Sequence, residues 1–222
     1  MRDAVLFDIH GNIDALAAVL SDAADAGCDG LLLGGDYAYM GPAPDDCVDL
    51  LREHPGRVVA IRGNTDRMIA NGDDAIAAWA ADRLGDERVS WLGGLQAARV
   101  LPEHDAVIVH AVPGDDEWRL TPDTPDELAE ARTADVGHAT MLCGHVHLQY
   151  SRKVGEVEVV NPGSVGFPFD GDQRAAWAII DDGQVELRRT AYDVERALAR
   201  LAGLASHPER ALAERRLQTA RS

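Results

Sequence analysis

Five short segments of the sequence combine carboxylate, imidazole and amide side chains at close spacing. They read Asp8-Ile9-His10, Gly34-Gly35-Asp36, Gly63-Asn64-Thr65-Asp66, a single His110, and Gly144-His145-Val146-His147. Such oxygen and nitrogen donors bind Mn, Fe, Zn or Ni, and no thiolate stands among them, which argues against a structural zinc site. One D-x-H or H-x-H segment alone is common, but four of the eight histidines fall in these five segments. The pattern therefore indicates one transition-metal site.

Each of these segments lies at or just after the end of an apolar run of strand length. The predicted strands are Ala4–Phe7, Leu31–Leu33, Val58–Ile61, Ala106–His110 and Thr140–Cys143. In open α/β sheets, ligand sites form outside the carboxyl ends of the strands. Residues two apart on extended backbone point the same way, so Asp8 with His10, and His145 with His147, are each expected to serve one site.

The remaining pattern predicts helices that cover a largely parallel sheet. The predicted helices are Asp14–Ala26, Asp45–Arg52, Asp74–Asp82, Asp86–Leu92, Pro125–Arg132, Asp193–Leu201 and Pro208–Leu217. Further strands are expected at Val157–Val160, Ala175–Ile180 and Val185–Thr190, with turns at residues 170–172 and 181–183 that suggest antiparallel hairpins. This order predicts an α/β fold. With no repeat or linker, we expect one domain over residues 1–192 and a helical tail, residues 193–222, packed on it or extending from it.

Composition limits the class of protein. The 222 residues suffice for one sizeable core. The net charge of −17 argues against nucleic-acid binding, and nuclease activity would need a local basic strip. No apolar run reaches the ~20 residues of a membrane helix, and no cleavage site follows the first apolar run, so we expect neither a membrane span nor a signal peptide.

Cysteine content and charge distribution add two expectations. The three scattered cysteines, Cys28, Cys47 and Cys143, exclude a disulfide framework and fit a reducing cytoplasm, and Cys143 is expected to pack in the core. Residues 188–222 hold eight arginines against four acids. This basic tail is interpreted either as a partner-binding segment or, preferably, as a solvated helix face.

The motif order D-x-H, G-D, G-N-x-D, a strand-end His and G-H-x-H resembles the calcineurin-like metallophosphoesterases, and most closely their small bacterial and archaeal phosphodiesterase branch. The residues Gly41-Pro42 and the loop Asn161–Gly166 support the resemblance, which extends from about Asp3 to Tyr192. It implies a four-layer α/β/β/α sandwich with two mixed β-sheets flanked by helices.

The resemblance also implies two divalent metal ions. One would be held by Asp8, His10, Asp36 and His147, and the other by Asp36, Asn64, His110 and His145. Manganese is the expected metal, with Fe, Zn or Ni as alternatives. The implied reaction is in-line attack on phosphorus by a metal-bridging hydroxide, with Asp36 bridging the ions and Asn64 donating a hydrogen bond to the phosphate.

Position 65 departs from the family pattern. The common form is G-N-H-D, whose histidine protonates the leaving oxygen and is oriented by the aspartate; here the residues are Thr65 and Asp66. General-acid help worth ~10²–10⁴ in rate is then missing, unless another acid such as His138 replaces it.

Other candidate side chains carry two interpretations each. We expect substrate contacts from Asn64, Thr65, Arg67 and Ser164, although surface ion pairing suits Arg67 and Arg174 equally well. Tyr37 and Tyr39 could line a pocket, with core packing preferred. Trp79 and Trp91 are expected to pack a helix onto the body.

The favoured function is therefore a metal-dependent phosphodiesterase acting on a small phosphate ester. Two alternatives stay open: a phosphomonoesterase for a small molecule, and a non-catalytic metal-binding scaffold for protein partners, as a retromer subunit of this fold is thought to be. The intact set of seven ligand positions favours an enzyme. A homo-oligomer also stays open.

Overall fold

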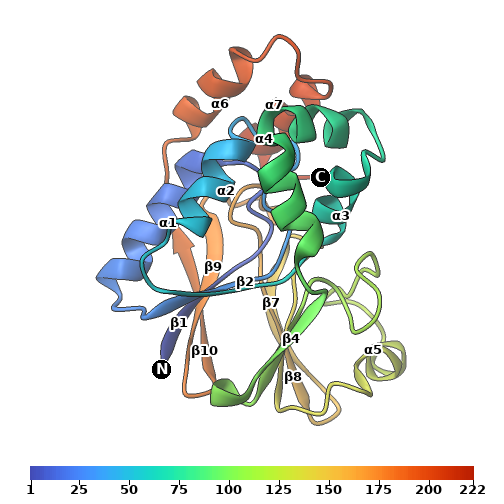
Figure 1. The fold of residues 1–222 in the computed structure, drawn as a ribbon. Coiled ribbons are helices and arrows are strands. Elements are labelled where there is room, and N and C mark those ends of the chain that lie inside the picture. The colour runs from blue at the N-terminus through green and yellow to red at the C-terminus, as the bar shows by residue number, and fades with distance from the viewer.

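Two mixed five-stranded sheets form the centre of the computed structural model, which describes all 222 residues (Figure 1). The first sheet has the order β10 (Gln184–Thr190), β9 (Ala175–Asp181), β1 (Arg2–Leu6), β2 (Gly30–Leu33) and β3 (Arg57–Ala60). The second has the order β4 (Ala98–Leu101), β5 (Ala106–Val109), β6 (Thr140–Leu142), β8 (Val157–Pro162) and β7 (Gln149–Val154). In each sheet the central strands are parallel, and antiparallel strands lie at one or both edges.

Alternate residues of the central strands face opposite layers. Val5 of β1 and Leu32 of β2 join a buried cluster that also contains Ile108 of β5 and Leu142 of β6, so the two sheets pack face to face. Leu6 of β1 belongs to a different cluster, formed with the helices of the first sheet. The predicted four-layer sandwich is thus confirmed.

Seven helices surround the sheets. They are α1 (Ile13–Asp25), α2 (Pro44–Arg52), α3 (Asn64–Asn71), α4 (Ala75–Gly94), α5 (Asp126–Thr133), α6 (Val194–Ala202) and α7 (Arg210–Thr219). Helices α1, α2 and α4 contribute to the core cluster of the first sheet, and α5 to that of the second. None of the helices is both long enough and apolar enough to cross a bilayer.

Several elements differ from the sequence prediction. Helix α3 and strands β4 and β7 were not predicted, because β4 and β7 are edge strands with exposed or polar residues and α3 starts within the motif Gly63-Asn64. The two short helices predicted before residue 93 are confirmed as the two parts of α4, which are divided by the non-helical backbone of Gly85 (φ +71°, ψ 166°). The turn at residues 170–172 joins strands of different sheets, so the hairpin predicted there is wrong. The hairpin between β9 and β10 is confirmed, with positive φ at Asp182 and Gly183.

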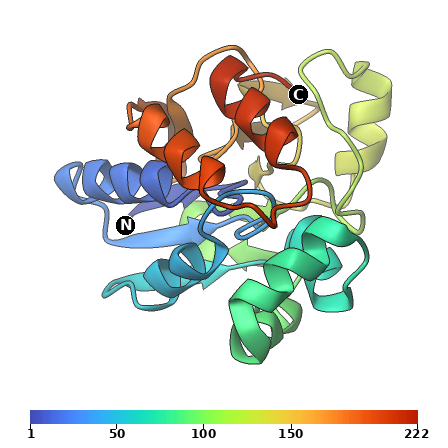
Figure 2. The ribbon, with the colours of Figure 1, turned by 90° about the horizontal axis from the view of Figure 1, so that it is seen from above.

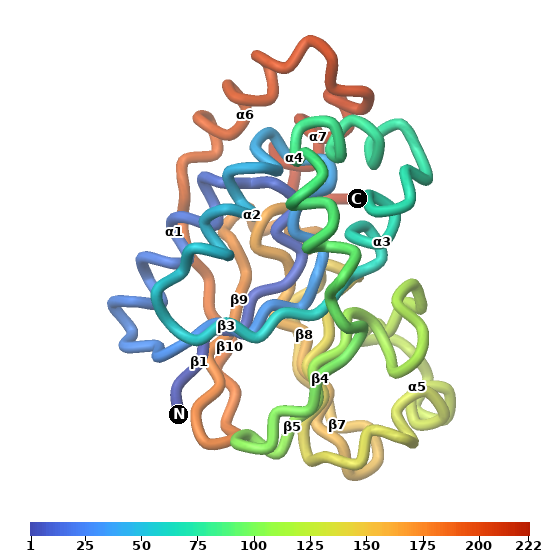
Figure 3. Tube along the Cα trace, in the orientation of Figure 1, coloured from blue at the N-terminus to red at the C-terminus, as the bar shows by residue number.

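The C-terminal tail arches over the end of the sandwich at which β1 and β2 finish (Figures 2 and 3). Ala197 and Leu201 of α6 and Leu217 of α7 share a buried cluster with Met40 and Phe167 of the body. In addition, Nε of Arg196 and Nε of Arg200 bind the two carboxylate oxygens of the buried Asp14, at 2.5 and 3.0 Å. The tail is therefore packed against the body.

Candidate metal centre

The five segments that contain the candidate ligands meet at one end of the sandwich. Each follows the carboxyl end of a strand, namely β1, β2, β3, β5 and β6. Backbone hydrogen bonds join the segments directly: the N–H of His10 donates to the carbonyl of Asp36 at 2.8 Å, and the N–H of Gly144 donates to that of His110 at 2.7 Å. The predicted convergence of the segments is therefore present.

The local backbone is left-handed at five of the candidate ligands. These are Asp8 (φ +54°), His10 (+50°), Asp36 (+61°), His145 (+66°) and His147 (+58°). The extended backbone expected for the D-x-H and H-x-H pairs is thus wrong: the chain curls at each of these residues instead. A non-glycine residue in this region costs on the order of 1–3 kcal/mol, and such strain gathers at ligand sites, where surrounding contacts enforce it.

Glycine is needed where these loops pass one another. A Cβ placed on Gly63 would lie 2.1 Å from Oδ1 of Asp36, and one placed on Gly35, where φ is +95°, would lie 2.4 Å from the backbone nitrogen of Gly63. Both distances are far below van der Waals contact. The glycines of the G-G-D and G-N-T-D motifs therefore permit the close approach of Asp36 to the start of α3.

Two imidazoles face each other in the first group of candidate ligands. Nε2 of His10 lies 3.1 Å from Nε2 of His147. Their Nδ1 atoms contact the backbone carbonyls of Tyr39 (3.1 Å) and Phe167 (2.6 Å), which assigns Nδ1 as a proton-bearing atom of each ring. In the neutral tautomer both Nε2 atoms carry lone pairs, and a metal ion between them would be bound by both.

Two carboxylates complete this group. Oδ1 of Asp8 lies 3.5 Å from Nε2 of His147 and 3.9 Å from Nε2 of His10. Oδ2 of Asp36 lies 3.6 Å from Nε2 of His10. Oδ1 of Asp8 is buried and has no hydrogen-bond partner. Ligands with metal bonds of about 2.1 Å are separated by roughly 3–4 Å, so these four residues fit a metal ion.

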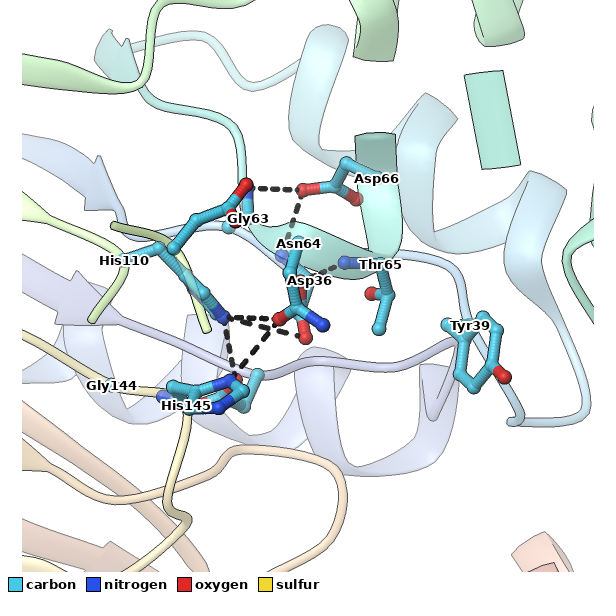
Figure 4. A network of polar contacts seen from close by, with 12 residues as sticks. Asp36, Tyr39, Gly63, Asn64, Thr65, Asp66, His110, Gly144 and His145 are labelled. Carbon is cyan, nitrogen blue, oxygen red and sulfur yellow. Dashed lines mark hydrogen bonds and ion pairs between the residues drawn. The ribbon is translucent and has the colours of Figure 1, made fainter. Parts of the chain in front are cut away.

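The second group is centred on Oδ1 of Asn64. This atom lies 3.0 Å from Nε2 of His110 and 3.1 Å from Nδ1 of His145 (Figure 4). Nδ1 of His110 contacts the carbonyl of Gly34 at 2.8 Å, so in the neutral ring the proton lies on Nδ1 and Nε2 is the atom available as a ligand. Oδ2 of Asp36 lies 3.5 Å from Nε2 of His110. The second group therefore also fits a cation, and it shares Asp36 with the first.

The buried charges shift several pKa values. Burial lowers the pKa of His10 to about 4, although Asp36 opposes this, so the ring is neutral and available as a ligand. Burial would also lower the pKa of His110, but the carboxylates of Asp36 and Asp8 outweigh it and the pKa is raised. For Asp8, burial favours the protonated form, but the neighbouring imidazoles outweigh it and the pKa is lowered.

Asp66 holds the Asp36 loop to the start of α3. Its Oδ2 accepts hydrogen bonds from the backbone N–H groups of Asp36 (2.8 Å) and Gly63 (2.9 Å), and its Oδ1 accepts one from Tyr37 (3.0 Å). Burial and the neighbouring Asp36 raise the pKa of Asp66 to about 7. The carboxylate therefore joins three backbone groups of two neighbouring loops.

A pocket of about 240 Å³ opens onto these ligands. Five of the seven candidate ligands line it, together with Thr65. The remaining lining side chains, which are largely apolar, are Tyr39, Met40, Phe167, Phe169 and Arg216. The last four are not predicted from the sequence; for Arg216, the basic character of the tail is the only sequence signal.

The residues predicted to contact substrate occupy different places. Asn64 and Thr65 line the pocket, and Oγ1 of Thr65 is buried without a partner. Ser164 is buried; its hydroxyl donates to the carbonyl of Asp8 at 2.7 Å and accepts from the N–H of Phe167 at 2.8 Å. Arg67 lies outside the pocket, in ion pairs with Asp116 (3.0 Å) and Glu117 (2.7 Å).

The remaining expectations are settled by local contacts. The buried Tyr37 hydroxyl donates to the carbonyl of Ile61 at 2.6 Å, which confirms core packing for Tyr37 but not for the pocket-lining Tyr39. Arg174 pairs with Asp172 at the surface. His138 pairs with Asp105 at 3.1 Å, before the start of β5, whereas the candidate ligand His110 follows the end of that strand. His138 therefore cannot supply a proton at the pocket.

Tryptophan and cysteine side chains also pack as predicted. Trp79 and Trp91 of α4 lie against the core cluster of the first sheet. Cys143 is buried in the cluster of the second sheet. All three cysteines are unpaired.

Comparison with known proteins agrees with this geometry. A family model described as the calcineurin-like phosphoesterase superfamily domain matches residues 1–183. An uncharacterized protein of Methanocaldococcus jannaschii is 28% identical over 228 residues, covering 89% of this chain and 90% of its own. The phosphodiesterase YfcE of Escherichia coli is 26% identical over 183 residues, covering 79% and 84%.

A solved structure of a metallophosphoesterase has the same overall fold. The metallophosphoesterase from Sphaerobacter thermophilus superposes with a TM-score of 0.83 at 25% identity, over 99% of both chains. Fold, motif order and family match thus coincide. The chain belongs to the calcineurin-like phosphoesterase superfamily, a metal-dependent family, and is a hydrolase of phosphoesters.

Proposed function

We propose that this protein is a dinuclear metal-dependent phosphodiesterase that hydrolyses a small phosphate ester. The observation that carries the proposal is the close approach of candidate ligand atoms in two adjoining groups that share Asp36. Nε2 of His10 faces Nε2 of His147, and Nε2 of His110 faces Oδ1 of Asn64. Two cations would turn both contacts into coordination, because each pairs atoms that can serve as ligands of one ion.

We assign seven residues as ligands. One ion would be held by Asp8, His10, Asp36 and His147, and the other by Asp36, Asn64, His110 and His145. A set of imidazole nitrogens and carboxylate or amide oxygens, without thiolate, suits Mn, Fe, Zn or Ni, and we favour Mn because oxygen ligands contribute to both groups. When bound, such ions lower the pKa of water toward neutrality and neutralise charge on phosphoryl oxygens.

The protein's own groups bind and orient the substrate. With Oδ1 of Asn64 directed at the two imidazoles, its amide N–H₂ is left to donate to a phosphoryl oxygen. Thr65 adds a hydroxyl that has no partner within the protein. The buried setting of Asp8 and Asp36, which are 0% and 2% exposed, keeps bulk water from competing for the ligands.

We favour a diester over a monoester because the relative YfcE is named a phosphodiesterase. The pocket volume of about 240 Å³ supports a small substrate. We further propose a cytoplasmic location, because the three cysteines, two of them buried, are unpaired. Cell fractionation tests the location.

The function is tested by metal reconstitution. Protein stripped with a chelator is reloaded with Mn²⁺, Fe²⁺, Zn²⁺ or Ni²⁺ and assayed on bis(p-nitrophenyl) phosphate and p-nitrophenyl phosphate. We expect two ions per chain, no hydrolysis by stripped protein, and faster turnover of the diester with Mn²⁺. Faster turnover of the monoester would indicate a phosphomonoesterase. Two bound ions without hydrolysis of any ester would indicate a scaffold.

A further inference from the structure

We propose that Arg216, on the C-terminal helix α7, binds a second anionic group of the substrate, a phosphoryl or carboxylate group distinct from the phosphoryl that is cleaved. The inference rests on the proposed phosphoesterase function and extends it to a substrate class. It also assigns a role to the basic tail: the tail completes the pocket.

Arg216 reaches the pocket from the far end of the sequence. It lines the same pocket as His147 and Asn64. Its Cζ lies 5.2 Å from the ring centroid of Phe169, and that ring stacks on the imidazole of His147 with centroids 4.3 Å apart and an interplanar angle of 15°. One aromatic ring therefore connects the guanidinium to a candidate metal ligand.

The guanidinium has no carboxylate partner. Carboxylates are nevertheless in excess, with 38 acidic against 21 basic residues. The other tail arginines that face the body, Arg196 and Arg200, both pair with Asp14. Arg216 donates only from Nη1 to Sδ of Met40, at 3.0 Å, and its Nε is buried without a partner.

This charge is costly unless a ligand compensates it. Burial, together with the neighbouring Arg215, lowers the pKa of Arg216, although the group stays protonated. A half-buried cation with unused donors lowers stability in the free protein, because its lost hydration is not replaced. An anionic substrate group at this place would supply the missing partner through charge-assisted hydrogen bonds.

The position of Arg216 favours a group other than the cleaved phosphoryl. The cleaved phosphoryl group would be neutralised by the metal ions of the proposed ligand groups, and the ring of Phe169 contacts both Arg216 and His147. The guanidinium therefore lies beyond the ligands, on the apolar side of the pocket formed with Phe167 and Met40. A substrate with one charged group at the ligands and another a few bonds away would fit both places.

The tail holds Arg216 in this position. Nε2 of the buried His207 donates to the carbonyl of Met40 at 2.7 Å, and the same imidazole packs on Trp79 with ring centroids 4.4 Å apart. Met40 itself has a left-handed backbone, with φ at +79°. The loop after Asp36 and the tail are thus fastened together on the side from which Arg216 enters the pocket.

The test uses non-hydrolysable ligands, so that it does not depend on turnover. Calorimetry with Mn²⁺-loaded protein compares propylphosphonate with 3-carboxypropylphosphonate and propane-1,3-bisphosphonate. We expect at least one two-anion ligand to bind about 10- to 100-fold more tightly, the range expected of hydrogen bonds between charged groups. The ligand that gains the most distinguishes a carboxylate from a phosphoryl group.

Two variants and one control decide the assignment. In Arg216→Gln the one-anion and two-anion ligands should bind with the same affinity. Arg216→Lys should keep part of the preference for the two-anion ligands because it keeps the charge. Arg215→Gln removes the same charge from the exposed neighbouring position and should retain the full preference. Thermal unfolding of each variant verifies that it is folded.

Three results would overturn the inference. They are equal binding of all ligands by the wild-type protein, an equal loss for all ligands in Arg216→Gln, and a lost preference in Arg215→Gln. Failure of the proposed function is seen separately: an Arg216-dependent preference without hydrolysis of any ester would refute the phosphoesterase and leave the anion site in place.

Discussion

The backbone N–H of Thr65 donates a hydrogen bond to Oδ1 of Asp36 at 3.0 Å, and this fixes the direction of the other carboxylate oxygen. Oδ2 of Asp36 lies 3.6 Å from Nε2 of His10 and 3.5 Å from Nε2 of His110, so it faces both candidate ligand groups. The start of helix α3 therefore orients the one oxygen that the two groups share.

The first prediction concerns this shared oxygen. Asp36→Asn should remove both metal ions, because an amide is a neutral and weaker ligand for either of them. The measurement is metal content per chain by elemental analysis after dialysis against Mn²⁺. Asp116→Asn is the matched control, since Asp116 lies in an ion pair with Arg67 outside the pocket, and it should keep two ions. Two ions retained in Asp36→Asn would contradict the shared role.

The second prediction separates the two ions. His147→Ala should deplete the ion beside His10, whereas His145→Ala should deplete the ion beside Asn64, because each imidazole contacts only its own group. Anomalous diffraction from Mn²⁺-soaked crystals of the two variants locates the remaining ion. Loss of the same ion in both variants would show that the division of ligands is wrong.

The residues of the site could be predicted from the sequence, whereas their backbone conformation could not. The five motifs could be placed together because parallel strands end at one edge of a sheet, a rule that needs only strand positions. The left-handed backbone of Asp8 and His10 could not be predicted, because contacts with loops distant in sequence impose it. Helix α3 was missed for a related reason: its first residues are also the motif residues Asn64 and Thr65.

The position of Arg216 in the pocket could not be predicted from the sequence pattern. In the sequence it is one arginine among the eight of residues 188–222, and nothing in its spacing distinguishes it from Arg215. Only the packing of α7 against Met40 and Phe169 brings it into the pocket. Strand β7 is similar, because as an edge strand it alternates buried and exposed residues and lacks an apolar run.

The third prediction concerns the carboxylate of Asp66. An asparagine there keeps one acceptor oxygen but turns an N–H₂ group toward the backbone donors of Asp36 and Gly63 or of Tyr37. We expect Asp66→Asn to lower the free energy of unfolding by about 1–3 kcal/mol, and to weaken metal binding about 10- to 100-fold. Urea unfolding and metal titration measure the two effects.

The control for this variant is Asp73→Asn, which makes the same change at an exposed position just after α3. It should alter neither quantity. Unchanged metal affinity in Asp66→Asn, with the protein still folded, would mean that Asp36 is oriented without the help of Asp66.

The final prediction concerns proton delivery to the leaving group. Thr65 lines the pocket with a hydroxyl that is not acidic at neutral pH, and His138 is too distant to replace it. The rate should therefore depend steeply on the pKa of the leaving alcohol, with aryl esters fast and alkyl esters slow. Thr65→His should flatten this dependence by favouring alkyl esters, by up to about 10²-fold. Thr65→Val is the control for lost hydrogen bonding and should keep the steep slope. Equal slopes for wild-type protein and Thr65→His, at equal metal content, would mean that the leaving oxygen takes its proton from a source other than the position of Thr65.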